Sequence, residues 1–231
     1  MSKIFVFKKE NVIFEGNFSL IYDISDQLPK HKNYPYGTNA IDPRSERRAV
    51  VGKYYDDEDR SIQKVVFHQT AGSYTPGFNG VMNTANFFVT DPKYDAKGNW
   101  LGNGRGWPGF AYTFYVPYEP EMHEGKWIIF QCNPLKRISW HTGNGQNEIS
   151  IAICFQGYFY SEHITRYFPR KGHDGHPSQA QIECAEEFWK LYCMEKLKIG
   201  DHEIYGHFDF GKLACPGADL ENIVRYYRGE F

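Results

Sequence analysis

The run EISIAICF, at residues 148–155, is almost continuous in apolar and β-branched side chains. A run of this length and composition is typical of a strand buried on both faces, as the central strands of a sheet are. Three shorter runs of the same character precede it along the chain: KVVFH (64–68), FAYTFYV (110–116) and KWIIFQC (126–132). Together the four runs predict a sheet in which residues 148–155 form a central strand.

Helical features accompany these strands. In HPSQAQIECAEEFWKLYCMEKLKIG, Ser178 is in position to cap a helix, Gln181 to complete a capping box, and Gly200 to end the helix. Residues 80–89 (GVMNTANFFV) predict a short helix, and residues 218–227 predict a terminal one. The expected fold is therefore an α/β structure with a mixed central β-sheet flanked by helices.

The first 60 residues have a different pattern, in which short apolar runs alternate with charged and Pro-containing stretches. We interpret residues 1–60 as an N-terminal extension of short strands and loops, packed on a main domain that spans residues 61–231. A chain of 231 residues is close to the size at which a single domain is the usual expectation. We expect a monomer.

The charge balance argues against nucleic acid and membranes as partners. The 26 Lys and Arg residues nearly balance 28 Asp and Glu residues, which leaves a formal net charge of −2 and no basic excess. No window approaches ~18 consecutive apolar residues, and the first residues lack the pattern of a secretion signal. We expect synthesis in the cytoplasm without a signal peptide. The five cysteines are odd in number and scattered, which indicates reduced thiols.

Three residues have the chemistry and placement of zinc ligands. His68 ends the run at 64–68, while His207 and Cys215 lie in YGHFDFGKLACPG (205–217), where one short loop brings an imidazole and a thiol together. Cys215 could instead be a buried small apolar residue, but its Gly- and Pro-containing turn favours the ligand role. A catalytic zinc keeps three protein ligands and one open position, which this set would provide.

A fourth candidate ligand leaves the kind of zinc site open. His141, in ISWHTGNGQNEISIAI (138–153), is also placed to bind a metal. Four protein ligands would complete the tetrahedron and make the zinc structural. The residues alone therefore permit either a catalytic or a structural site.

Five segments, in this order and spacing, resemble the type 2 N-acetylmuramoyl-L-alanine amidases, a family that includes phage lysozyme-type amidases and the peptidoglycan recognition proteins. They are VVFHQTAG (65–72), FAYTFYV (110–116), WHTGNGQNEISIAI (140–153), HPSQAQIECAEEFW (176–189) and YGHFDFGKLACPG (205–217). The resemblance covers about residues 62–228 and implies the zinc amidase and recognition-protein fold. It also implies a Zn²⁺-dependent hydrolase of bacterial peptidoglycan, which cuts the amide bond between the lactyl group of N-acetylmuramic acid and L-alanine of the stem peptide.

The resemblance assigns roles to the matching positions. It makes His68, His207 and Cys215 the metal ligands, and it places His141 in the substrate groove near the metal. Tyr112 resembles the family's tyrosine that stabilises the negative charge developing on the carbonyl oxygen, a role that a phenol fills as a hydrogen-bond donor. The metal site is thereby expected to be catalytic.

The substrate contacts are predicted from the residues themselves. Asn144 and Asn147 are expected to bind the stem peptide, because they lie in the polar loop after His141. Trp107, in a loop rich in Gly, Asn and Pro, is expected to offer its ring to a sugar face.

Two positions depart from the family pattern. Members with a catalytic Glu carry it where this chain has Cys154, and phage-type members carry a Lys where this chain has Leu213, two residues before the cysteine ligand. Lys212 lies one place earlier, and we predict that it takes the catalytic role because its long stem tolerates the offset.

The alternative function is a non-catalytic peptidoglycan-binding receptor. Some members of the family bind without cutting, usually after losing the cysteine ligand, which this chain retains as Cys215. We therefore favour a bacteriolytic enzyme that degrades the cell wall. The predicted role is a phage endolysin, which reaches the wall after release by phage lysis or within a virion.

Overall fold

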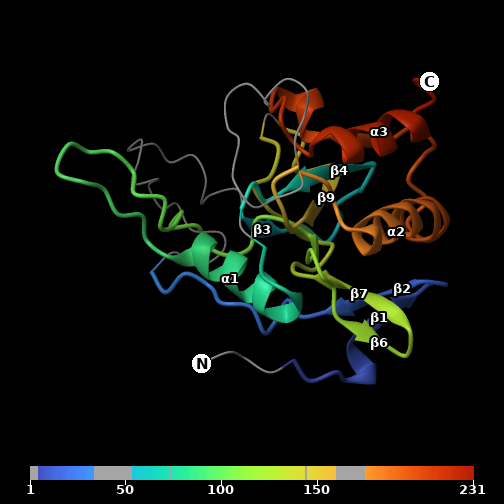
Figure 1. Ribbon diagram of the computed structural model, residues 1–231, viewed down its shortest axis with the longest axis horizontal. Coiled ribbons are helices and arrows are strands. Elements are labelled where there is room, and N and C mark those ends of the chain that lie inside the picture. Colours follow the sequence, from blue (N-terminus) through green and yellow to red (C-terminus); the bar gives the residue numbers. More distant parts are fainter. Residues whose placement is uncertain (1–4, 34–53, 73, 144, 160–174) are drawn as a thin grey trace.

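The computed structural model describes residues 5–33, 54–72, 74–143, 145–159 and 175–231. Within these residues a large sheet has the strand order β1-β2-β7-β5-β9-β4-β10, with β6 paired to β7 (Figure 1). Its strands are β1 (Val12–Glu15), β2 (Ser19–Asp23), β4 (Lys64–Gln69), β5 (Phe114–Val116), β6 (Met122–His123), β7 (Lys126–Gln131), β9 (Ser150–Phe155) and β10 (Ile204–Gly206). A small second sheet pairs β3 (Tyr55–Asp56) with β8 (Arg137–Ile138).

The large sheet contains both kinds of pairing. Strands β5, β9, β4 and β10 run parallel to one another, whereas β7 runs antiparallel to β5 and β1 runs antiparallel to β2. Strand β9 lies between β5 and β4, and each of its residues is buried. The predicted mixed sheet and the central position of residues 148–155 are both confirmed.

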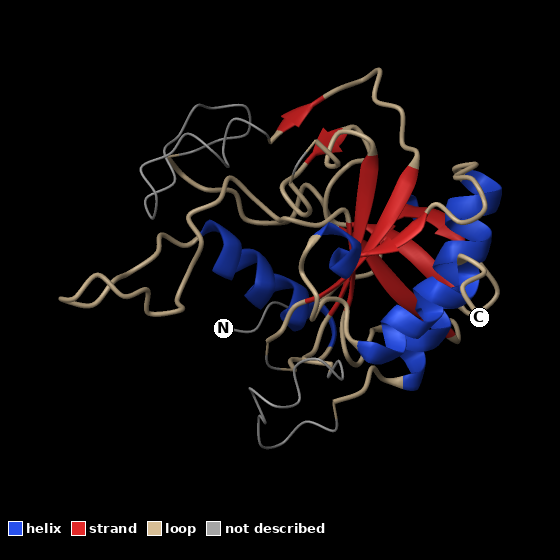
Figure 2. Cartoon of the chain, turned by 90° about the horizontal axis from the view of Figure 1, so that it is seen from above, coloured by secondary structure: helices blue, strands red, loops and turns tan. Residues whose placement is uncertain are grey.

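Helices cover both faces of the sheet, as Figure 2 shows. Helix α1 (Gly77–Val89) packs on one face, and α2 (Gln179–Glu187) and α3 (Ala218–Tyr227) pack on the other. Helix α2 continues into the wider turns of a π-helix, η3 (Phe188–Lys196), and two short 3₁₀ turns are η1 (Lys9–Asn11) and η4 (His207–Phe210). The capping box of Ser178 and Gln181 is present. The α/β fold with flanking helices is confirmed.

The predicted strand at residues 110–116 is shorter in the structure, where only Phe114–Val116 form β5. The main-chain carbonyl groups of residues 110–112 accept hydrogen bonds from side chains and not from a neighbouring strand. Asn133 donates to the carbonyls of Phe110 and Tyr112, and Ser139 donates to that of Ala111. Sequence periodicity does not report such side-chain bonds.

The N-terminal strands belong to the large sheet, because β2 pairs in parallel with β7 from Ser19 to Asp23. The buried carboxylate of Glu187, on α2, holds the turn between β1 and β2. It accepts hydrogen bonds from the main-chain N–H groups of Asn17, Phe18 and Ser19 and from the Ser19 hydroxyl. Backbone donors thus compensate the charge that would otherwise be costly to bury.

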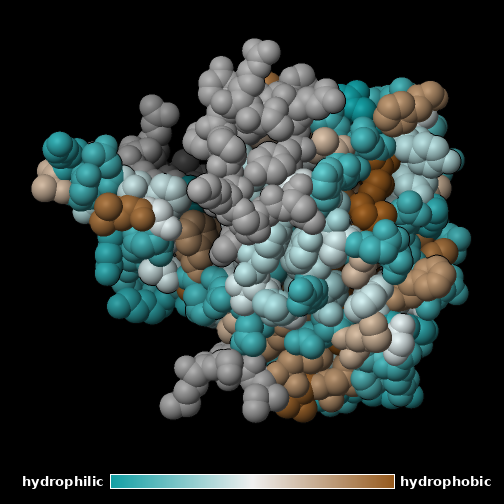
Figure 3. Space-filling model, in the orientation of Figure 1, coloured by the Kyte–Doolittle hydropathy of each residue, from teal (hydrophilic) through white to brown (hydrophobic). Residues whose placement is uncertain are grey.

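The surface is mainly hydrophilic on the face drawn in Figure 3, with hydrophobic residues in small patches. Among the described residues, no helix is long and apolar enough to cross a membrane.

Candidate metal centre

The carboxyl ends of two neighbouring parallel strands bring the predicted ligands together. His68 lies near the end of β4, and His207 directly follows β10, whose register pairs Gly206 with Phe67. Cys215 lies in the loop before α3 and completes the group. The potential ligand atoms of these three residues all lie within 4.8 Å of one another.

The donor group fits a zinc ion in its chemistry, and its ligand atoms, within 4.8 Å of one another, lie farther apart than on a bound ion. His68 Nδ1 lies 3.9 Å from Cys215 Sγ, and the rings of His68 and His207 have centroids 4.5 Å apart. Ligands on a tetrahedral zinc are about 3.5 Å from one another, given Zn–N and Zn–S bonds of about 2.0 and 2.3 Å. A shift of a few tenths of an ångström would therefore bring His68 and Cys215 to that spacing. Three protein donors leave the fourth position of a tetrahedron open.

Burial controls the protonation of these donors. It lowers the pKa of His68 well below its usual range, and burial together with the charge of Lys212 lowers the pKa of His207 to about 4. Burial raises the pKa of the Cys215 thiol to about 12, partly offset by a hydrogen bond from the Gln69 main-chain N–H. At neutral pH both imidazoles are free to bind a metal, and the thiol gives up a proton when it binds.

Main-chain hydrogen bonds fix the loop that carries His207 and Cys215. Phe208 N donates to the Cys215 carbonyl over 2.7 Å, Lys212 N donates to the His207 carbonyl over 3.1 Å, and Cys215 N donates to the Lys212 carbonyl over 2.8 Å. Gly211 ends η4 at a positive φ of 85°, a conformation that glycine adopts without strain. The loop therefore holds both donors without a metal.

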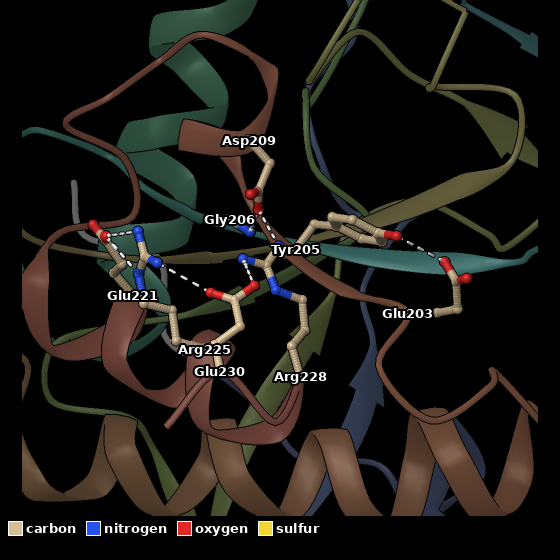
Figure 4. A network of polar contacts seen from close by, with 8 residues as sticks. All are labelled: Glu203, Tyr205, Gly206, Asp209, Glu221, Arg225, Arg228 and Glu230. Carbon is tan, nitrogen blue, oxygen red and sulfur yellow. Dashed lines mark hydrogen bonds and ion pairs between the residues drawn. The ribbon is translucent and has the colours of Figure 1, made fainter.

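A network of polar contacts supports this loop from behind (Figure 4). Asp209 accepts a hydrogen bond from Gly206 N over 2.9 Å, and Arg228 donates to the same carboxylate oxygen over 2.8 Å. Arg228 also pairs with Glu230, which pairs with Arg225. The end of α3 is thus connected to the turn that precedes His207.

His141, the possible fourth ligand, lies on the side of His68 that faces away from Cys215. Its Nδ1 is 3.2 Å from His68 Nε2, the ring nitrogen remote from Cys215, and its Nε2 is 3.3 Å from Ser150 Oγ. The His141 side chain is buried, and the three-residue donor group does not include it. Its predicted role in the substrate groove stays a prediction.

A half-buried arginine, Arg60, organises the segment around His141. Arg60 donates five hydrogen bonds, to the carbonyls of Glu148, Leu135, Arg137, Asn147 and Ser150. Burial lowers the pKa of this guanidinium to about 10, so it remains charged. Burial and the Arg60 charge lower the pKa of His141 to about 3. Arg60 therefore fixes the backbone of the segment and keeps His141 neutral.

Tyr112 lies beside the donor group, with its ring centroid 5.0 Å from that of His68. Burial and the neighbouring Cys154 raise the pKa of its phenol well above the usual value. Cys154 is opposite His68 in the register of β4 and β9, so the two side chains share one face of the sheet. The tyrosine is therefore a neutral hydrogen-bond donor next to the metal centre.

The remaining predicted site residues differ in position. Lys212 is exposed in the loop between His207 and Cys215, here called the ligand loop. Asn144 lies outside the described residues. Asn147 is fully buried, and its Oδ1 accepts from the N–H groups of His141 and Thr142 and from the Thr142 hydroxyl. The side-chain Oδ1 of Asn147 thus holds the loop at residues 141–142. The contact of Asn147 with substrate stays a prediction.

An aromatic row connects Trp107 to the metal centre. Trp107 stacks on Phe88, with centroids 5.2 Å apart and an interplanar angle of 4°, and Phe88 contacts Tyr112 at 5.7 Å. Trp107 Nε1 is buried and has no hydrogen-bond partner among the described residues. Its binding of a sugar face remains a prediction.

Sequence patterns did not identify several residues that build this site. Gln69 and Arg60 act through contacts between segments that are distant in the chain, whereas Ser150 and Asp209 lie in the same segments as His141 and His207. Closeness in the sequence to a predicted site residue is the signal that could have indicated Gln69, Ser150 and Asp209. Nothing comparable marks Arg60.

The fold and the site define an α/β protein that carries a His–His–Cys donor group at the carboxyl edge of its sheet. The family model described as N-acetylmuramoyl-L-alanine amidase (Amidase_2) matches residues 58–218. The chain therefore belongs to the N-acetylmuramoyl-L-alanine amidase family, and the resemblance found in the sequence is confirmed.

Two solved peptidoglycan recognition protein structures share this fold at low sequence identity. One chain of the complex of tracheal cytotoxin with the ectodomains of peptidoglycan recognition proteins LCa and LCx is 20% identical with a TM-score of 0.51, over 79% of this chain and 90% of that one. Wild-type Drosophila PGRP-LB is 15% identical with a TM-score of 0.50, over 74% and 84%. The N-acetylmuramoyl-L-alanine amidase LysC from Clostridium intestinale is 17% identical with a TM-score of 0.47, over 75% and 89%. A comparison with curated proteins gives no significant match.

Proposed function

We propose that this protein is a zinc-dependent N-acetylmuramoyl-L-alanine amidase, which hydrolyses the bond between the lactyl group of N-acetylmuramic acid and L-alanine of the stem peptide. The observation that carries the proposal is the group formed by His68, His207 and Cys215, whose ligand atoms lie within 4.8 Å of one another. Three protein ligands would leave the fourth position of a tetrahedral zinc open. Family membership supports the reaction class. The retained Cys215 favours hydrolysis over binding alone.

Zinc bound to these donors would supply Lewis-acid chemistry, which polarises a carbonyl group and makes water a stronger nucleophile at neutral pH. The neutral phenol of Tyr112 donates a hydrogen bond to the oxygen of the scissile carbonyl as negative charge develops on it. The Lys212 ammonium, exposed on the ligand loop, adds a positive charge that stabilises the same oxygen.

Recognition of peptidoglycan would use the surfaces around the metal centre. In this proposal the stem peptide contacts His141, Asn144 and Asn147, and a sugar ring packs on Trp107. A phage endolysin is the biological role that we infer, with access to the wall after lysis or from a virion.

Digestion of purified peptidoglycan tests the proposal. The zinc-loaded protein should release stem peptides that begin at L-alanine and leave the glycan strands intact, as mass spectrometry of the products would show. Cys215→Ser should release none, although it should still sediment with peptidoglycan. An endopeptidase or a glycosidase would give products of different mass, and either would contradict the assignment.

The receptor alternative has its own readout in the same experiment. If the wild-type protein binds both zinc and peptidoglycan but releases no peptide, the chain is a receptor. If it binds zinc but not peptidoglycan, neither function is correct.

A further inference from the structure

The hydrogens of a buried chain of polar groups behind His68 can be assigned from their partners. The chain begins at Ser150, whose Oγ lies 2.5 Å from the carbonyl oxygen of Gln146. A carbonyl oxygen only accepts, so the Ser150 hydroxyl donates its hydrogen to Gln146. Ser150 Oγ therefore has only lone pairs to offer to its other neighbour, His141 Nε2, at 3.3 Å.

The ring of His141 must consequently donate from Nε2. His141 is 7% exposed, and the Arg60 guanidinium donates to the carbonyl of Ser150, so the ring lies in a buried site that already holds a cation. With its one hydrogen on Nε2, His141 presents an unprotonated Nδ1. This acceptor lies 3.2 Å from His68 Nε2.

His68 in turn must donate from Nε2, because two lone pairs would otherwise face each other in a buried site. Its Nδ1 then carries a lone pair and lies 3.9 Å from Cys215 Sγ, on the side where the donor group assembles. The opposite tautomer would direct an N–H bond into the metal position and prevent coordination.

We propose that Ser150 and His141 form a hydrogen-bond relay that fixes the tautomer of His68 and so presents its Nδ1 to the metal. The role of the relay depends on the metal centre of the proposed function. Its hydrogen bonds are present in the protein without metal. His141 and Ser150 are positioning residues in it. Metal-bound histidines commonly donate their second N–H to a carboxylate or carbonyl group, and here another histidine accepts it.

The relay also constrains what His141 can do for the substrate. Both of its ring nitrogens are engaged, one with Ser150 and one with His68. Only the face or edge of the ring remains for contact with peptidoglycan.

Two-bond ¹H–¹⁵N correlation spectra of the full chain, labelled with ¹⁵N-histidine, test the relay directly. In the metal-free protein His68 and His141 should both be the Nε2–H tautomer, and zinc should shift the His68 Nδ1 resonance. An Nδ1–H tautomer of either ring in the metal-free protein would overturn the relay. If zinc shifts no His68 resonance while both tautomers are as expected, the relay stands and the zinc centre of the proposed function is wrong.

Variants of His141 extend the test to metal affinity, measured by competition with a chromophoric chelator. His141→Leu removes the acceptor and should weaken zinc binding about 10- to 100-fold, the usual effect of losing such a partner. His141→Asn can return a carbonyl oxygen near the position of Nδ1 and should recover most of this loss. Zinc binding by His141→Leu that equals wild type would overturn the proposal, and the wild-type spectra decide the question if that variant fails to fold.

Discussion

The main-chain N–H of Gln69 donates a hydrogen bond to Cys215 Sγ over 3.3 Å, and so joins the end of β4 to the ligand loop. The Gln69 side chain makes two more connections: its amide group donates to the Ala214 carbonyl, and its carbonyl accepts from Phe159 N. One residue therefore aligns the cysteine with His68, the neighbouring ligand on the same strand.

Replacement of Gln69 by Ala should lower the free energy of unfolding by about 1–3 kcal/mol, because two buried main-chain groups lose their partners. Urea denaturation of the metal-free protein measures this loss. Gln69→Met is the matched control for packing, since it keeps the length of the side chain and loses both hydrogen bonds. If the Met variant is as stable as the wild type, the two hydrogen bonds contribute nothing.

Zinc should stabilise the wild-type protein and not Cys215→Ser. Free zinc at 100 times the dissociation constant adds about 2.7 kcal/mol to the free energy of unfolding. The pKa of the Cys215 thiol is raised to about 12, so the thiol is protonated at pH 6 and at pH 8 and loses one proton on binding. Zinc affinity should therefore increase about tenfold per pH unit over this range. An affinity independent of pH would mean that the thiol is not a ligand.

Arg60→Met should destabilise the protein by at least about 3 kcal/mol, because it removes five hydrogen bonds to partly buried main-chain carbonyl groups and keeps only the apolar stem. Arg60→Lys retains the charge but cannot reach five acceptors at once. Chemical denaturation of both variants would distinguish the contribution of the charge from that of the bonds. Wild-type stability in Arg60→Lys would show that the charge alone is sufficient.

Asp209→Ala should weaken zinc binding about tenfold, the lower end of the effect seen when groups supporting a ligand are removed. The change removes the carboxylate that accepts hydrogen bonds from Gly206 N and from Arg228, so the turn before His207 loses its connection to α3. Asp209→Asn retains an acceptor for Gly206 N and loses the ion pair, so it should have the smaller effect. Equal losses in the two variants would assign the whole effect to Arg228.

Tyr112→Phe should decrease kcat for stem-peptide release about 100- to 1,000-fold and leave zinc binding unchanged, since a single donor to a developing oxyanion contributes that much. Substrate turnover and zinc titration of the same preparation measure the two effects. Hydrolysis at the wild-type rate would remove Tyr112 from the mechanism.

The sequence was sufficient for the parts of the molecule that depend on local pattern. Apolar runs located the central strand at residues 148–155, and the Ser178 capping box located the start of α2. The three donors were found because His68 ends a strand and because His207 and Cys215 share one short loop. Each of these signals lies within a few residues of the feature that it predicts.

Features that depend on distant contacts were not predictable in the same way. The side-chain bonds of Asn133 replace the first part of the predicted strand 110–116, and Arg60 contacts the segment that contains His141 and Ser150 from a part of the chain about 80 residues away. The sequence left His141 open as a fourth ligand, because spacing alone does not tell which nitrogen of His68 it faces. The distinction depends on the orientation of the two rings, which the spacing does not encode.

The pairing of β2 with β7 bears on how this chain could be recombined with others. The family match begins at residue 58, which invites a junction there in a hybrid enzyme. A hybrid made in that way would lack β2 and leave the apolar strand Lys126–Gln131 with an uncovered edge, the kind of edge that recruits other chains into aggregates. It would also leave the Glu187 carboxylate without its backbone donors. A hybrid built from this chain should therefore include residues 12–23 as well as the region that matches the family. The part of the chain that can be transferred is thus larger than the part that the family model matches.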